Sequence, residues 1–188
     1  MKNEEYISIC GLNCGLCPRF HSSAKSRCEG CRFTPAHDYC SLYRCCVTKQ
    51  GLFSCANCTD FTCERYIRVS GVSQGLDSFI SHKPMQENLE RIKKEGLASV
   101  ATEQAERRKI AAELIREFNE GRSCTFYCTA AALISIKSIK KAVAEGKQAI
   151  QERLASMQDM KTIAKIMKTA IQSSADREGV NLKLRKAK

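Results

Sequence analysis

The sequence predicts a mainly α-helical protein with a small, irregular, cysteine-rich metal-binding segment of the zinc-ribbon or knuckle type at its N-terminal end. Two observations lead to this fold class. Eleven of the thirteen cysteines lie between Cys10 and Cys63, and the second half carries apolar residues three and four positions apart, as amphipathic helices do. We therefore expect a metal-binding segment over residues 1–66, a connector over residues 67–84 and a basic helical domain over residues 85–188.

The cysteines of the first segment include three pairs with C-x2-C spacing. These pairs are Cys14 with Cys17, Cys28 with Cys31, and Cys55 with Cys58. A turn of that length brings two sulfur atoms to one ion, and a second pair completes a tetrahedral site. The first two pairs could form one four-cysteine site, and the third could form another with two of Cys40, Cys45 and Cys63. The candidate metal ligands are therefore Cys10, Cys14, Cys17, Cys28, Cys31, Cys40, Cys45, Cys55, Cys58 and Cys63.

The first residues of the chain and the hydropathy along the whole chain indicate the cellular compartment of the protein. Glu4 and Glu5 stand where a secretory signal would carry positive charge before an apolar stretch. No segment approaches the roughly 18 consecutive apolar residues of a membrane span. We therefore expect a cytoplasmic protein, and in that reducing compartment clustered cysteines are typically metal ligands, because structural disulfides are rare there.

Zinc is the cofactor that this pattern favours, with an iron–sulfur cluster as the alternative. Structural zinc contributes about 10–16 kcal/mol to the folding of zinc-finger peptides, which would offset the lack of regular structure in such a segment. Cys10-x3-Cys14-x2-Cys17 has the spacing with which radical S-adenosylmethionine enzymes hold a [4Fe-4S] cluster, but those enzymes consist of βα repeats, which this chain does not show. An iron–sulfur protein would act in redox chemistry or electron transfer. In a zinc site, His21 or His37 could replace one thiolate.

Several short motifs along the chain together form a set that can be compared with known families. The first is Cys10-Gly-Leu-Asn-Cys14-Gly-Leu-Cys17-Pro18, followed by Cys28-Glu-Gly-Cys31, Cys55-Ala-Asn-Cys58, Phe61-Thr-Cys63-Glu64, Gly121-Arg-Ser-Cys-Thr-Phe126-Tyr127-Cys128 and Glu178-Gly-Val-Asn-Leu-Lys-Leu-Arg185. This set resembles an uncharacterised prokaryotic family of cysteine-rich domains that open with CGLxCxxCP and are taken to bind zinc. Thr62 departs from the pattern, which leads us to expect proline there. The resemblance covers most of the chain and implies metal binding but no particular reaction.

Four helices are predicted in the second half. Their apolar stripes are built by Leu89 and Ile92, by Ile110–Phe118, by Ile136–Val143 and by Ile163–Ile171. Glycine follows glutamate at Gly96, Gly121, Gly146 and Gly179, and each of these glycines is a candidate helix end because glycine adopts the left-handed conformation easily.

The two ends of the chain carry patterns typical of strands. Residues 180–184 alternate apolar and polar side chains, and Tyr6–Ile9 is the comparable run near the N-terminus. We therefore expect a short two-stranded pairing of the termini.

The remaining cysteines and the basic residues of the second half offer two further candidate sites. Cys46, Cys124 and Cys128 are candidates for an additional metal or redox site, and Cys124 and Cys128 share a face at a helix start, where they could equally be buried packing residues. The net charge is +11, of which +9 lies beyond residue 66. Lys161, Lys165 and Lys168 would line one helix face and could contact nucleic acid.

The chain carries no catalytic motif that would assign a reaction. It has no P-loop, dinucleotide fingerprint, HExxH or nucleophile elbow. The leading hypothesis is therefore a metal-binding protein that recognises a protein partner. The alternatives are an iron–sulfur redox protein and a nucleic-acid-binding zinc protein.

Overall fold

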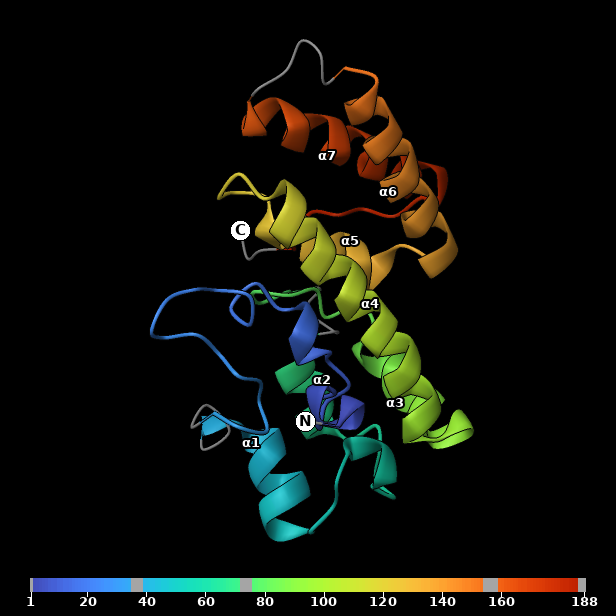
Figure 1. The fold of residues 1–188 in the computed structure, drawn as a ribbon. Coiled ribbons are helices and arrows are strands. Elements are labelled where there is room, and N and C mark those ends of the chain that lie inside the picture. Colours follow the sequence, from blue (N-terminus) through green and yellow to red (C-terminus); the bar gives the residue numbers. More distant parts are fainter. Residues whose placement is uncertain (1, 35–38, 72–75, 154–158, 186–188) are drawn as a thin grey trace. The chain divides into compact units, whose positions relative to one another are not determined.

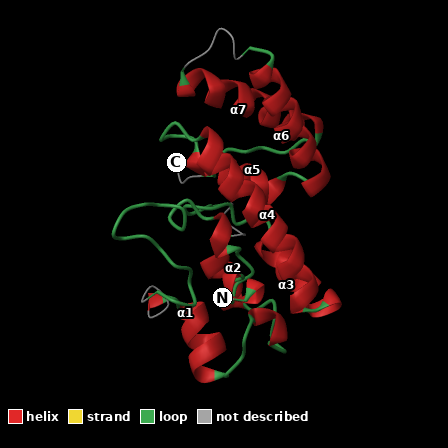
Figure 2. Cartoon of the chain, viewed as in Figure 1, coloured by secondary structure: helices red, strands yellow, loops and turns green. Residues whose placement is uncertain are grey.

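The computed structural model describes residues 2–34, 39–71, 76–153 and 159–185. Within these ranges the protein is mainly helical, as predicted, and forms seven α-helices and no strand (Figures 1 and 2). The helices are α1 Ser41–Tyr43, α2 Glu64–Ser70, α3 Met85–Glu95, α4 Leu97–Phe118, α5 Cys124–Leu133, α6 Ile136–Gln151 and α7 Met160–Arg177. None of these described helices is long and apolar enough to cross a membrane.

Short helical turns supplement the α-helices in the cysteine-rich part. Three of them are 3₁₀ turns, at Asn3–Tyr6, Cys14–Leu16 and Cys55–Asn57. A π-helical segment, Arg44–Lys49, continues α1. Two of the 3₁₀ turns start on a cysteine of a C-x2-C pair, so these turns determine where the thiols point.

The chain divides into two compact units. The first comprises the described residues up to Ala105 together with Leu184 and Arg185, and the second comprises Glu106–Lys183. The first unit therefore includes residues 67–71 and 76–84, α3 and the start of α4, which the sequence assigned to a connector and to a separate helical domain. The physical reason is the apolar face of α3, which is buried among the side chains of the cysteine-rich segment.

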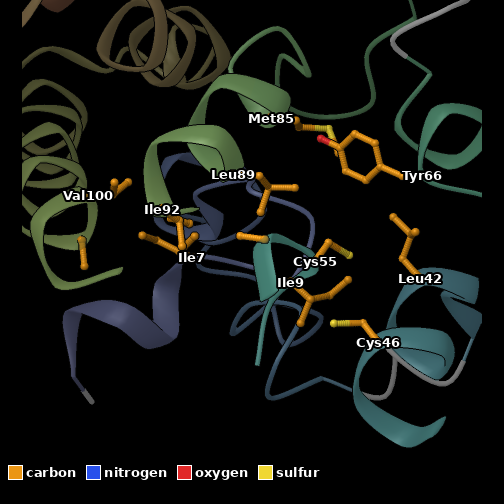
Figure 3. Close-up of a cluster of buried hydrophobic side chains, with 12 residues drawn as sticks. Ile7, Ile9, Leu42, Cys46, Cys55, Tyr66, Met85, Leu89, Ile92 and Val100 are labelled. Carbon is orange, nitrogen blue, oxygen red and sulfur yellow. The ribbon is translucent and has the colours of Figure 1, made fainter. Parts of the chain in front are cut away.

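A hydrophobic core holds the first unit together (Figure 3). Met85 and Leu89 of α3 and Tyr66 of α2 are at most 2% exposed, and they lie in one cluster with Ile7 and Ile9 from the N-terminal segment. The cysteine-rich segment therefore has a packed core in addition to its thiols. The remaining buried members of this hydrophobic core are Leu42, Cys46, Cys55, Ala56, Ile92, Val100 and Ala101.

The second unit is organised around helices α6 and α7, which pack along each other (Figure 1). Gly146 lies inside α6, so the prediction that a helix ends there is wrong. An added Cβ at Gly146 would lie 2.8 Å from the sulfur of Met167, which is fully buried on α7. A Cβ at Gly146 would therefore require the end of the Met167 side chain to shift. Gly96, Gly121 and Gly179 do follow helix ends, each with positive φ.

The predicted pairing of the termini is wrong. Ile7 forms an isolated antiparallel bridge with Asn13, and Tyr6 belongs to a 3₁₀ turn. Val180 donates its N–H to the carbonyl oxygen of Ala175 at 2.8 Å, which closes the end of α7. A local turn at each place uses the backbone groups that a strand would have paired.

Candidate metal-binding cysteine clusters

Four cysteines line one hollow of about 370 Å³ in the first unit. They are Cys14, Cys17, Cys28 and Cys31, and we call them the first cluster. These are the two C-x2-C pairs that the sequence assigns to one site. Ten residues lie between Cys17 and Cys28, so the chain must fold back on itself to bring the two pairs to the same hollow.

The first pair lies on a capped 3₁₀ turn. The Asn13 side chain accepts a hydrogen bond from the N–H of Gly15 at 3.0 Å, and the N–H of Cys17 donates to the carbonyl oxygen of Cys14 at 3.1 Å. The Asn13 amide nitrogen in turn donates to Gln104 of α4, at 3.0 Å to the side-chain oxygen. The turn that carries Cys14 and Cys17 is therefore held from both sides by buried hydrogen bonds.

Gly30 allows the second pair to approach the first. The N–H of Cys31 donates to the Sγ of Cys14 at 3.4 Å. Gly30 has a φ of +107°, and a Cβ there would lie 3.3 Å from the Cβ of Cys14. A larger side chain would therefore be strained by its backbone conformation and would press on the first pair. The Glu-Gly-Cys sequence is the signal from which this turn could have been predicted.

A second cluster lines a much smaller hollow, of about 30 Å³. Its members come from the π-helical segment, from the turn Cys55–Asn57 with its C-cap residue, and from the N-cap of α2. They are Cys45, Cys46, Cys55, Cys58 and Cys63. A hollow of that size has room for about one water-sized particle.

The turn at Cys55 repeats the geometry of the turn at Cys14. The Ser54 side chain accepts from the N–H of Ala56 at 3.2 Å, and the N–H of Cys58 donates to the carbonyl oxygen of Cys55 at 3.1 Å. Ser54 thus has the role that Asn13 has in the first cluster. The same local structure presents one C-x2-C pair to each hollow.

Arg32 lies between the two clusters. It directly follows Cys31, and its guanidinium donates to the carbonyl oxygens of Ile7 at 2.9 Å and Phe53 at 2.8 Å. Its guanidinium carbon also lies 3.8 Å from the centre of the Phe53 ring. Since Phe53 immediately precedes the turn that holds Cys55, this side chain connects the backbones that carry both clusters.

The thiols interact in pairs. The hydrogen bond that the Cys14 thiol donates to Cys31 lowers the pKa of Cys31 to about 7, and the positive charge of Arg32 adds to this effect. The same hydrogen bond, with burial, raises the pKa of Cys14. In the second cluster, the hydrogen bond between the two thiols raises the pKa of Cys55 and lowers that of Cys46. In each cluster one sulfur is thus held as a donor and its neighbour favours the thiolate, the form that binds metal.

The described side chains do not yet form a coordination sphere. Across residues 2–34, 39–71, 76–153 and 159–185, no three His, Cys, Asp or Glu side chains converge closely enough to hold an ion. The described cysteines also form no disulfide. Sulfur donors nevertheless gather in sets of four and five, and such sets suit soft or borderline metals such as zinc and iron in clusters.

Two predicted ligands lie beside the hollows rather than in their linings. The Sγ of Cys10 lies 2.8 Å from the hydroxyl oxygen of Ser8, and burial raises the pKa of Cys10 to about 11. Cys40 is the N-cap residue of α1, and both cysteines pack against the hydrophobic core. Cys46, which we expected only as part of an additional metal or redox site, lines the second hollow instead.

The histidines have other partners. The Nε2 of His21 lies 2.8 Å from the carbonyl oxygen of Gly15, in the first C-x2-C turn. His82 contacts the carbonyl oxygen of Ser70 through Nδ1 at 2.6 Å. His37 lies outside the described residues.

The other predicted site residues lie in the second unit. Cys124 and Cys128 are on α5, and a hydrogen bond from Cys128 lowers the pKa of Cys124. Lys161 and Lys165 are exposed on α7. Lys168 is only 36% exposed and forms an ion pair with Glu120 at 3.2 Å.

The lining of the first hollow includes side chains that sequence reasoning did not connect with the cysteines. Arg19 and Arg27 are close to the cluster in sequence, whereas Phe79 and Ile80 come from a distant segment. No local pattern marks a contact between residues so far apart in the chain.

Comparisons of the chain with protein-family models, curated proteins and solved structures found no match. The resemblance of the cysteine motifs to a family therefore stays a prediction.

Proposed function

We propose that this chain is a zinc-binding protein whose two cysteine clusters each hold one ion, and that the assembled cysteine-rich unit recognises a protein partner. In this proposal Cys14, Cys17, Cys28 and Cys31 hold the first ion. Four of the five thiols of the second cluster hold the other. Each bound zinc ion would cross-link distant parts of the chain. It would draw the thiols of its own cluster, as thiolates, into its coordination sphere.

One observation carries the proposal: two C-x2-C pairs that are separate in sequence line one hollow with no other ionisable group than two arginines. The backbone turn with a capping side chain, repeated at Cys14 and Cys55, supports it further. Each turn presents two sulfur atoms from a short loop. The two pairs would have to come closer together to provide four ligands, because no three of the described thiols converge on one point.

The exposed apolar side chains support a role in recognition. Among the described residues, the second unit exposes one large apolar side chain, Met160. The large apolar side chains that the first unit exposes are Phe33, Tyr39, Phe53, Ile67, Val69 and Phe79. Scattered apolar side chains are normal on a surface, but aromatic ones are enriched at protein interfaces. The cysteine-rich unit is therefore the part that we expect to contact a partner.

Elemental analysis of the chain, purified anaerobically without added metal, tests the proposal. We expect two zinc ions per chain and no iron. Stoichiometric iron with labile sulfide and visible absorption would establish the iron–sulfur alternative instead. A chain that is folded and free of metal would contradict both.

Single substitutions assign the ions to the clusters. Cys14→Ser is expected to remove one zinc ion and Cys55→Ser the other, because serine does not provide the thiolate ligand. Cys124→Ser, in the second unit, is the matched control and should retain both ions. Unchanged zinc in Cys14→Ser would remove the first cluster from the proposal.

A further inference from the structure

The two hollows differ about tenfold in volume, although each is lined by a cysteine cluster. The second, at about 30 Å³, is just large enough for one small particle. The first, at about 370 Å³, falls in the range of pockets that hold small organic molecules. Four sulfur atoms around one ion do not require that space, so the first hollow has room for a second occupant.

The lining of the first hollow combines apolar and cationic surface. Its apolar wall is formed by Leu12, Phe79 and Ile80. Its charged side chains are Arg19 and Arg27, and its lining includes no Asp or Glu. Three hydroxyl groups complete the lining, those of Ser26, Thr34 and Ser78.

Both guanidinium groups stack on aromatic rings. The guanidinium carbon of Arg19 lies 5.0 Å from the centre of the Phe79 ring, and that of Arg27 lies 5.0 Å from the centre of the Phe20 ring. Stacking engages the flat face of a guanidinium and leaves its N–H edge available for an anion. Within the described ranges, neither arginine forms an ion pair.

We propose that this hollow binds a small organic anion, with its anionic group on Arg19 and Arg27 and its apolar part against Leu12, Phe79 and Ile80. A planar carboxylate matches the N–H edge of arginine, and such charge-assisted hydrogen bonds are stronger than neutral ones. An apolar body of one or two rings matches the available volume and the apolar wall.

Bound metal would change the total charge of the lining but not this contact. A divalent ion held by four thiolates carries a net charge of −2, which balances the two guanidinium groups. Arg19 and Arg27 are exposed whereas Cys14 is buried, so the guanidinium edges lie nearer to solvent than this thiol does. The anionic group therefore meets its hydrogen-bond donors at the mouth of the hollow.

Calorimetric titration of the full chain with 2-naphthoate and with the neutral 2-naphthylmethanol tests the proposal. We expect naphthoate to bind about tenfold more tightly, because only its carboxylate accepts charge-assisted bonds from both arginines. Equal affinity for the two probes would overturn the anion site. Binding of neither probe would overturn the pocket itself.

Three variants locate the binding. Arg19→Gln combined with Arg27→Gln should abolish the preference for naphthoate, whereas Arg65→Gln, beside the second hollow, should leave it unchanged. Phe79→Ala should weaken both probes, and this side chain is 57% exposed, so its loss leaves the buried core intact. A preference that survives in the double variant would overturn the assignment. The zinc content of every sample is measured as well. Failure of the zinc proposal can then be distinguished from failure of the anion proposal.

Discussion

Asp77 binds Arg185 and so attaches the C-terminal end of the described chain to the rest of the first unit. The carboxylate is only 1% exposed, and its two oxygens accept four hydrogen bonds, from the N–H of His82 and from the backbone and guanidinium of Arg185. The Asp77 N–H also donates to the carbonyl oxygen of Arg185 at 2.9 Å. We predict that Asp77→Asn loosens this attachment. In either orientation of the amide, its NH₂ group would face two N–H donors.

The magnitude follows from the pKa of Asp77. Burial raises that pKa, but the hydrogen bonds from Arg185 and His82 outweigh burial and lower it from 3.8 to about 2. One pKa unit corresponds to about 1.4 kcal/mol, so the ionised carboxylate contributes about 2 kcal/mol to the free energy of unfolding. Because the folded-state pKa is the lower one, this contribution is present above about pH 4 and is lost as the pH falls through about 2.

A double-mutant cycle in urea at neutral pH measures this contribution. Asp77→Asn and Arg185→Gln should each lower the free energy of unfolding by about 2 kcal/mol, and the double variant should lose little more than either one. The exposed Asp60→Asn is the control and should change it little. Additive effects of the two substitutions, with a coupling energy near zero, would refute the reasoning, as would a difference from wild type that does not shrink as the pH falls from about 4 towards about 2.

Two further predictions concern glycines at close approaches. Gly30→Ala should lower zinc affinity at the first cluster more than Gly51→Ala does in a competition titration, because both glycines have positive φ but a Cβ at Gly51 meets no atom within 4 Å. Equal losses of zinc affinity in the two variants would show that backbone strain, and not contact with Cys14, causes the loss. Gly146→Val should destabilise the second unit by about 1–3 kcal/mol through overpacking against Met167, whereas Gly146→Ala, whose Cβ meets only the flexible end of that side chain, should change stability by less than about 1 kcal/mol. Thermal unfolding followed by circular dichroism compares the two, and equal stability of both variants would contradict the packing argument.

The sequence by itself determined the features that depend on neighbouring residues. Helical periodicity located the apolar stripes of α3, α4, α6 and α7, since side chains three and four apart share a face. The C-x2-C spacing indicated the turns at Cys14 and Cys55, because a capped turn is closed by groups within five residues of each other. The grouping of Cys14, Cys17, Cys28 and Cys31 at one site was also among the sequence-based expectations.

Only the tertiary structure decided the features that depend on contacts between distant segments. It placed Cys46 rather than Cys40 in the lining of the second hollow, and it brought Phe79 to the lining of the first. It kept α6 helical through Gly146, which packs against the buried Met167 of α7. It also brought Arg185 to Asp77, whereas residues 180–184 form no pairing with the N-terminal run Tyr6–Ile9. Hydrophobic burial and buried hydrogen bonds outweigh local preference at these positions, because they act between groups that no sequence window contains together.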